Sequence, residues 1–295
     1  MVEEEKRVAL SNPNQDFQVR CENLRKVYWE DNKPKVAVRN ISFGLDFGDC
    51  FALLGVNGAG KTTTFKSLTR DVTPTKGSVH IAGLNIADLE NFERARKMIG
   101  YCPQFDAIFF GMTVYEHLWF YARIKGIVPE LRDQIIERQI EQMDLTNFRD
   151  VRAEKLSGGN KRKLSVAMAL IGNPPIIFLD EPSTGMDPQA KRFMWTIISK
   201  ISTLRKRSAV ILTTHSMEEA EALCTKIGIM VSGHFKCFGS AQHIKSKYGD
   251  GYELEVKIKI PTLQEIENMR DRMGYSQGKR RTSHPRSPAH HLRRH

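Results

Sequence analysis

The sequence has no long apolar run and few cysteines, and both absences limit what the protein can be. No stretch of about eighteen or more apolar residues occurs, so we expect no membrane-spanning helix, and we expect no signal peptide. The five cysteines are odd in number and form no Cys-x-x-Cys pair. This usage favours reduced packing residues over a disulfide framework or a zinc site. No internal repeat is evident.

Positive charge is in excess, but it is unevenly placed. Of the net charge of +11, residues 270–295 carry +7, from seven arginines and one lysine against Asp271 alone. This end also contains proline and serine and is poor in apolar residues, which predicts a basic, disordered tail over residues 269–295. Three interpretations of this tail stay open. The first choice is a solvated tail, the second is attraction to an anionic membrane surface, and the third is nucleic-acid binding.

Apolar segments alternate with helix-like segments along most of the chain. The strand candidates are residues 50–54, 176–179, 209–213 and 227–231. This order predicts an α/β fold with a mainly parallel core sheet. Earlier, residues 17–21 and 41–45 alternate apolar and polar side chains, which predicts an N-terminal antiparallel β subdomain that carries Tyr28 in a turn near its base.

A different pattern occupies the region between Gln104 and Ser157. Apolar residues recur there at helical spacing, namely Leu131, Ile135, Ile136, Ile140 and Met143. We therefore expect a helical insert subdomain over about residues 105–172, with these side chains on its packed face.

The most informative stretch follows the apolar residues 51–54 and fits Gly-x-x-x-x-Gly-Lys-Thr, the phosphate loop of nucleoside triphosphatases. Its glycines allow the backbone N–H groups to approach a polyphosphate at the start of the next helix. Lys61 would neutralise the β and γ phosphates, and the Thr62 hydroxyl would bind Mg²⁺. The predicted nucleotide contacts are Gly55, Asn57, Gly58, Ala59, Gly60, Lys61, Thr62 and Thr63.

A second element, Asp180-Glu181, follows the apolar residues 176–179. Taken alone, such a pair is often a solvated strand end. Beside a phosphate loop, however, it predicts a hydrolytic site in a P-loop NTPase core. Asp180 would face Mg²⁺, commonly through water, and Glu181 would polarise the attacking water.

The turn Ser157-Gly158-Gly159, ahead of the Asp180 strand, distinguishes this chain from other phosphate-loop proteins. With it, the sequence resembles the ATP-binding-cassette (ABC) family over roughly residues 17–260. The resemblance implies that Tyr28 stacks on adenine, although the adjacent Trp29 stays an alternative. It also implies that Gln104 couples the nucleotide and Mg²⁺ site to a membrane domain, and that His215 contacts the γ-phosphate.

Within this family the chain looks most like the A subfamily of transporters, and like the second nucleotide-binding domain of such a chain. Asn160 is the discriminating residue, because most cassettes carry glutamine there. The stretches that also look like this subfamily are residues 101–107, 116–118, 121–123, 157–165 and 183–188.

The resemblance implies a domain plan. Residues 1–16 are an N-terminal extension and 17–247 an ABC ATPase domain. Residues 248–268 begin a truncated regulatory-domain-like segment, whose opening strand is expected over 247–256.

The implied function is ATP hydrolysis that powers a transporter of the lipid-moving A subfamily, at the cytoplasmic face of a membrane. Two cassettes would dock head to tail, so that Ser157, Gly158 and Gly159 of one close on ATP held by the other. The transmembrane domains of an ABC transporter would be further partners. The alternative is a soluble ABC ATPase acting on ribosomes or nucleic acid, which the A-type motifs disfavour. A third alternative, a small-nucleotide kinase, is disfavoured, because such kinases have a phosphate loop but no Ser-Gly-Gly turn.

Overall fold

The computed structural model describes residues 17–204 and 208–248. The chain divides into two compact units, residues 1–249 and 250–295, and all described residues belong to the first. The predicted basic tail and most of the regulatory-domain-like segment therefore lie outside the described residues. No helix in the described part is long and apolar enough to cross a bilayer.

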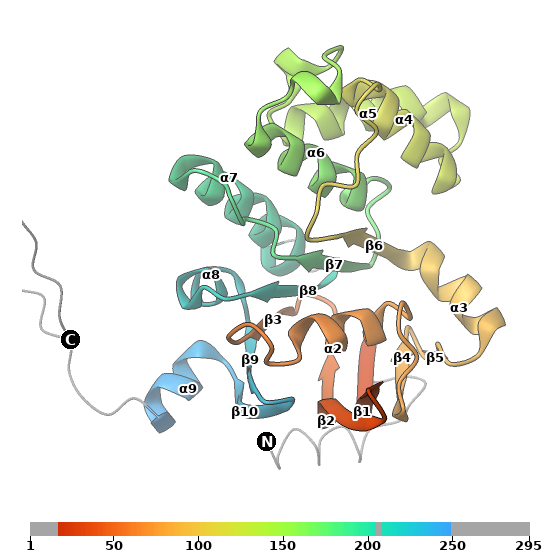
Figure 1. Cartoon of the computed structure of the whole chain (residues 1–295). Coiled ribbons are helices and arrows are strands. Elements are labelled where there is room, and N and C mark those ends of the chain that lie inside the picture. Colours follow the sequence, from red (N-terminus) through yellow and green to blue (C-terminus); the bar gives the residue numbers. More distant parts are fainter. Residues whose placement is uncertain (1–16, 205–207, 249–295) are drawn as a thin grey trace, which may run out of the picture. The chain divides into compact units, whose positions relative to one another are not determined.

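A six-stranded sheet forms the centre of the first unit (Figure 1). Neighbouring strands are parallel except for the first pair in the order given below, which forms an antiparallel hairpin. In spatial order the strands are β10 (His234–Gly239), β9 (Lys226–Val231), β3 (Cys50–Leu54), β8 (Ala209–Thr214), β7 (Ile176–Asp180) and β6 (Ile99–Cys102). The predicted mainly parallel core is confirmed.

The N-terminal segments form a separate antiparallel sheet, as expected. Its order is β2 (Lys33–Leu45), β1 (Val19–Glu30), β4 (Lys76–Ile81) and β5 (Leu84–Asn85). The placement of Tyr28 in a turn is wrong, because Tyr28 lies within β1 opposite Lys35. The turn comes later, at Asp31 and Asn32, which both have positive φ.

Helices follow the strands and fill the insert. They are α2 (Lys61–Leu68), α3 (Leu89–Ala95), α4 (Val114–Ile124), α5 (Pro129–Gln142), α6 (Gly158–Leu170), α7 (Pro188–Ser199), α8 (Met217–Leu223) and α9 (Ala241–Tyr248), with short turns η1 (Arg96–Met98), η2 (Thr146–Phe148) and η3 (Ala153–Lys155) and the π-helical η4 (Lys200–Leu204). Figure 1 shows α4 and α5 beyond the β6 edge, with α6 between them and the sheet. The strand expected from residue 247 is wrong at its first two residues, because these end α9.

Two apolar cores hold these layers together. One lies between the central sheet and α4, α5 and α6, and it includes Ile136, Ile140 and Met143 from the predicted stripe. Leu131 departs from the expectation, because it is exposed in the first turn of α5. The other core lies between the two sheets and is rich in phenylalanine, with the Phe43 and Phe51 ring centroids 4.9 Å apart. Each fully buried ring of this kind contributes about 2–3 kcal/mol to folding.

Candidate active site

The phosphate loop connects β3 to α2, and its glycines are required by the fold. Gly60, which caps α2, has φ 106°. A Cβ there would lie 2.6 Å from the Ala37 carbonyl oxygen, and one on Gly55 would lie 2.5 Å from that of Met230. Both distances are shorter than side-chain carbons tolerate. The loop can therefore take this path only with glycine at these positions.

Neighbouring segments and Lys61 hold the loop in place. The Gly233 N–H donates to the Ala59 carbonyl oxygen at 2.9 Å. The Lys61 ammonium donates to the carbonyl oxygens of Gly55 at 2.7 Å and Val56 at 3.2 Å, and the residue is buried. A cation thus sits inside the loop, at the N-terminal end of α2, where partial positive charge also gathers. This arrangement suits an anionic group such as a polyphosphate.

Asp180 ends β7 beside β8, in a largely buried position. The Thr213 hydroxyl of β8 donates to Asp180 Oδ1 and also accepts from the Glu181 N–H at 3.0 Å. Burial raises the pKa of the Asp180 carboxyl above its usual range, and the neighbouring Glu181 charge raises it further. The hydrogen bond from Thr213 and the charges of Arg162 and Lys61 act in the opposite direction. A cation bound here would keep this carboxylate ionised.

Glu181 adopts an uncommon backbone conformation, with φ 48°. For a non-glycine residue this region costs about 1–2 kcal/mol, and such strain gathers at functional sites. Its carboxylate accepts from the Thr184 hydroxyl at 3.0 Å, and its other oxygen lies 3.6 Å from His215 Nδ1. The His215 side chain is 61% exposed, whereas that of Glu181 is 12% exposed. The carboxylate is therefore aimed by its neighbours and remains reachable by water.

The oxygen ligands expected for Mg²⁺ are present but few. Thr62 is exposed at the start of α2, which follows β3, and Asp180 supplies a carboxylate at the end of β7, on the other side of β8. Among the described residues, no three histidine, cysteine, aspartate or glutamate side chains gather to hold a metal. Hydroxyl and carboxylate oxygens fit a hard cation that completes its shell with water and phosphate, as Mg²⁺ does.

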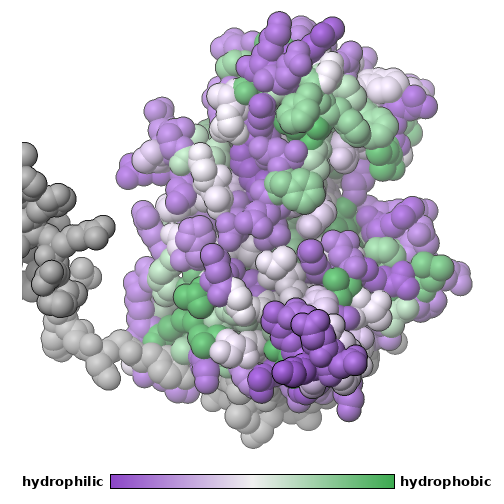
Figure 2. Space-filling model, in the orientation of Figure 1, coloured by the Kyte–Doolittle hydropathy of each residue, from purple (hydrophilic) through white to green (hydrophobic). Residues whose placement is uncertain are grey.

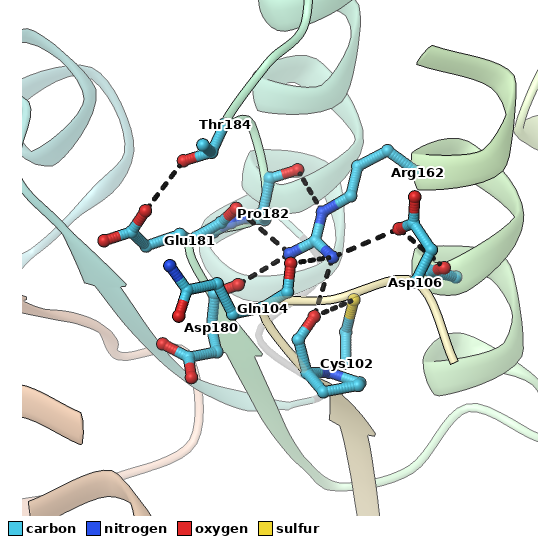
Figure 3. A network of polar contacts seen from close by, with 10 residues as sticks. Cys102, Gln104, Asp106, Arg162, Asp180, Glu181, Pro182 and Thr184 are labelled. Atoms are coloured by element: carbon cyan, nitrogen blue, oxygen red, sulfur yellow. Dashed lines mark hydrogen bonds and ion pairs between the residues drawn. The ribbon is translucent and has the colours of Figure 1, made fainter. Parts of the chain in front are cut away.

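Gln104 lies in the loop after β6, where it is exposed. Its backbone carbonyl accepts from Arg162 Nη1 at 3.3 Å. Figure 3 shows the Gln104 amide directed to the side on which the Asp180 and Glu181 carboxylates lie. The structure thus brings the loops after β6 and β7 to one edge of the sheet.

The Ser157-Gly158-Gly159 turn lies on a different surface. Ser157 caps α6, because its hydroxyl accepts from the Asn160 N–H at 3.2 Å. Neither glycine has an atom within 4 Å of an added Cβ. The turn borders a cleft of about 480 Å³ whose other walls come from α6, residues 185–187 and the start of α7. The described lining of this cleft includes neither Lys61 nor Glu181.

The two candidate rings for a base lie side by side in sequence on β1. Tyr28 is half-buried, with the Lys26 ammonium 5.1 Å from its ring centroid, whereas Trp29 is 73% exposed. Both rings lie on this strand, and Trp29 is the more exposed of the two.

Sequence reasoning missed two residues that shape the site, Thr213 and Arg162. Thr213 bonds both carboxylate-bearing residues at the end of β7. Arg162 is buried on α6 and donates to the backbone of both neighbouring loops. A polar residue near the end of the apolar run 209–212 was a signal for Thr213. A basic residue one turn into a helix gave no such signal.

Comparisons with known proteins are consistent with this geometry. The family described as "ABC transporter" matches residues 38–184. The human retinal-specific phospholipid-transporting ATPase ABCA4 is 50% identical over 260 residues, which is 88% of this chain and 11% of that protein. The human glucosylceramide transporter ABCA12 is 48% identical over 236 residues, 80% of this chain and 9% of that protein. The chain therefore spans about a tenth of these curated relatives.

A solved structure shares the fold. It is a dimeric ATP-binding cassette in a post-hydrolysis state, bound to ADP and Pi. The TM-score is 0.69 at 22% identity, over 75% of this chain and 98% of that one.

Proposed function

We propose that this chain, which belongs to the ABC transporter family as an ATPase cassette of the A-subfamily type, powers lipid movement across a membrane. In this proposal it binds ATP with Mg²⁺ and hydrolyses ATP in a head-to-tail dimer of cassettes. One observation carries the proposal. Lys61, which follows β3, lies near Asp180 and Glu181 at the carboxyl end of β7, and β8 lies between these two strands in the sheet.

ATP binding would use the phosphate loop. Its N–H groups and the Lys61 ammonium would hold the β and γ phosphates, after Lys61 exchanges its bonds with the Gly55 and Val56 carbonyls for phosphate oxygens. Tyr28 or Trp29 would stack on the adenine ring. Thr62, Asp180 and Gln104 would hold Mg²⁺ directly or through water, and the cation would neutralise phosphate charge.

Hydrolysis would depend on the aimed carboxylate of Glu181. This group would accept a hydrogen bond from the attacking water, with Thr184 and His215 fixing its direction. His215 and Lys61 would stabilise charge on the transferred phosphoryl group. The positive φ of Glu181 supports this role, because strain at a carboxylate beside a phosphate loop fits pre-organisation.

A second cassette would complete each site. Ser157 and Gly158 are exposed at the start of α6, Gly159 is partly exposed, and the described lining of the cleft beside them includes neither Lys61 nor Glu181. The N–H groups of such a turn suit the γ-phosphate of ATP held by another cassette. The dimer of the similar cassette described above supports this arrangement. Loss of the γ-phosphate would then release the two cassettes.

Transmembrane domains of an ABC transporter would be the other partners, at the cytoplasmic face of a membrane. Figure 2 shows hydrophobic side chains gathered over the α4–α5 region. Exposed aromatic residues in the helical region and the loop before it are Phe105, Phe109, Phe110 and Phe120. Because this loop also contains Gln104, changes at the nucleotide site would be transmitted to a partner that binds to these aromatic residues. The names of ABCA4 and ABCA12 support a phospholipid or glycolipid cargo.

The substitution Glu181→Gln tests the proposal. It should leave ATP affinity unchanged, lower steady-state ATPase by at least about 100-fold, and trap an ATP-dependent dimer measurable by size-exclusion chromatography. Glu218→Gln, at an exposed position on α8, is the matched control and should keep wild-type activity. Unchanged ATPase in Glu181→Gln would refute the assigned role.

A further inference from the structure

Arg162 is a buried cation to which the proposed chemistry assigns no role. It lies on α6, about one turn after Ser157, and is 4% exposed. All three guanidinium nitrogens donate hydrogen bonds, and most of the acceptors are backbone carbonyl oxygens. A planar group with five N–H donors is suited to such a set.

The acceptors belong to two loops at the edge of the central sheet (Figure 3). On the loop after β6, Nη1 donates to the carbonyl oxygens of Pro103 at 2.7 Å and Gln104 at 3.3 Å. At the end of β7 and in the loop that follows it, Nη2 donates to the carbonyl oxygens of Asp180 at 2.6 Å and Glu181 at 3.0 Å. One side chain of α6 therefore ties together the loops that carry three predicted site residues.

The contacts to the second loop fix the backbone on both sides of the Glu181 side chain. Nε donates to the Pro182 carbonyl oxygen at 3.1 Å, so three successive carbonyls accept from one guanidinium. The Glu181 N–H is held separately, by the carbonyl and the hydroxyl of Thr213 at 3.2 and 3.0 Å. A non-glycine residue at φ 48° persists only where its surroundings fix it. Arg162 and Thr213 provide that restraint.

An ion pair does not explain the position of Arg162. In the described part of the chain its ion-pair partner is Asp106, whose carboxylate lies 3.4 Å from Nη1 and also accepts from the Ser165 hydroxyl at 3.1 Å. The bonds to the carbonyls are shorter and come from all three nitrogens. The main interaction of Arg162 is therefore with the backbone carbonyl groups of these two segments.

We propose that Arg162 is a positioning residue that keeps the Glu181 carboxylate and the Gln104 loop in a fixed relation to the Ser157-Gly158-Gly159 turn. This inference rests on the proposed function, because it assumes that Glu181 acts in ATP hydrolysis. A nucleotide that is held by another cassette and contacts Ser157 then influences the position of Glu181 in this chain, through the first turn of α6 and the Arg162 guanidinium.

The test compares Arg162→Lys and Arg162→Gln with Arg149→Lys in the full 295-residue chain. Arg149 is a matched control, because it pairs with the carboxylates of Glu137 and Asp150 on the surface of the helical insert. The measurements are kcat and KM for ATP, the Kd of ATP, the Tm, and amide hydrogen exchange of a peptide covering residues 180–186.

We expect Arg162→Lys to lower kcat by about 10- to 100-fold, as small misplacements of a reacting group do. KM and Kd should stay within about twofold, because the phosphate loop is untouched. Exchange in residues 180–186 should become faster. Arg149→Lys should leave all five quantities unchanged.

Each other outcome decides against the inference. Wild-type kcat and exchange in Arg162→Lys would overturn it, and so would a loss confined to ATP affinity. Loss of the folded state in both Arg162 variants would make the residue structural and overturn it too. If the wild-type chain hydrolyses ATP while Arg162→Lys is unaffected, only this inference fails. If Glu181→Gln keeps full activity, the proposed function fails first.

Discussion

Replacing Gly60 by alanine should destabilise the protein in a way that Gly58→Ala does not. Both glycines have positive φ, 106° for Gly60 and 79° for Gly58, so alanine at either position meets the same kind of backbone strain. Their surroundings differ. A Cβ on Gly60 would lie 2.6 Å from the Ala37 carbonyl oxygen in β2, whereas one on Gly58 would have no atom within 4 Å.

The expected magnitudes follow from this difference. The left-handed conformation costs an alanine about 1–2 kcal/mol, which is the whole effect expected for Gly58→Ala. In Gly60→Ala the backbone of β2 or of the loop must also shift, which adds about 1–3 kcal/mol. The total is about 2–5 kcal/mol. Gly111→Ala is the control, since it has neither positive φ nor a close neighbour and should stay within about 0.5 kcal/mol of wild type.

Urea unfolding without nucleotide measures these free energies, and ATP titration shows whether the shift of the loop also weakens binding. We expect Gly60→Ala to bind ATP more weakly as well. If Gly60→Ala proved no less stable than Gly58→Ala, the contact between the loop and β2 would not constrain residue 60, and the geometric argument for glycine would be wrong.

Three further predictions concern single side chains. Lys61→Ala should raise the Kd of ATP by about 10- to 100-fold, because a charged hydrogen-bond donor to phosphate is lost; a wild-type Kd would count against the phosphate-loop assignment. Thr213→Val should lower the free energy of unfolding by about 1–3 kcal/mol, because the Asp180 carboxylate and the Glu181 N–H lose a partner; equal urea midpoints would disprove this. Burial lowers the pKa of His117, which is neutral with Nδ1 bonded to the Thr113 carbonyl and Nε2 accepting from the Phe109 N–H. Its contribution to stability should therefore be present above the unfolded-state pKa of about 6.5 and be lost as pH falls below it towards the lowered folded value. His117→Gln should lack this component in unfolding measured from pH 8 to 5, and an unchanged pH dependence would rule it out.

The elements that the sequence predicted well are those whose signal is local. Strand β3 spans residues 50–54 as expected, because a parallel strand buried on both faces is apolar without interruption. The phosphate loop is equally local, since its glycines and lysine act through backbone geometry within a few residues. The roles assigned to its side chains stay predictions.

The misses arise where distant segments decide the outcome. Tyr28 was expected in a turn because alternation was recognised only over residues 17–21, whereas the structure continues β1 to Glu30 through register shifts between Cys21 and Val27. Leu131 fits the helical stripe, but in the first turn of α5 its side chain is 50% exposed. Arg162 resembles any solvent-exposed basic residue until the carbonyls that it bonds, 18 or more residues away in sequence, are brought beside it.

The position of β3 has a consequence for biosynthesis. This strand pairs with β8 on one side and β9 on the other, so the loop that follows it is supported by residues up to Val231. On the ribosome, the phosphate loop would emerge long before either neighbour is synthesised. A nascent cassette therefore cannot complete the part of the sheet that supports its phosphate loop until residues up to Val231 have been translated.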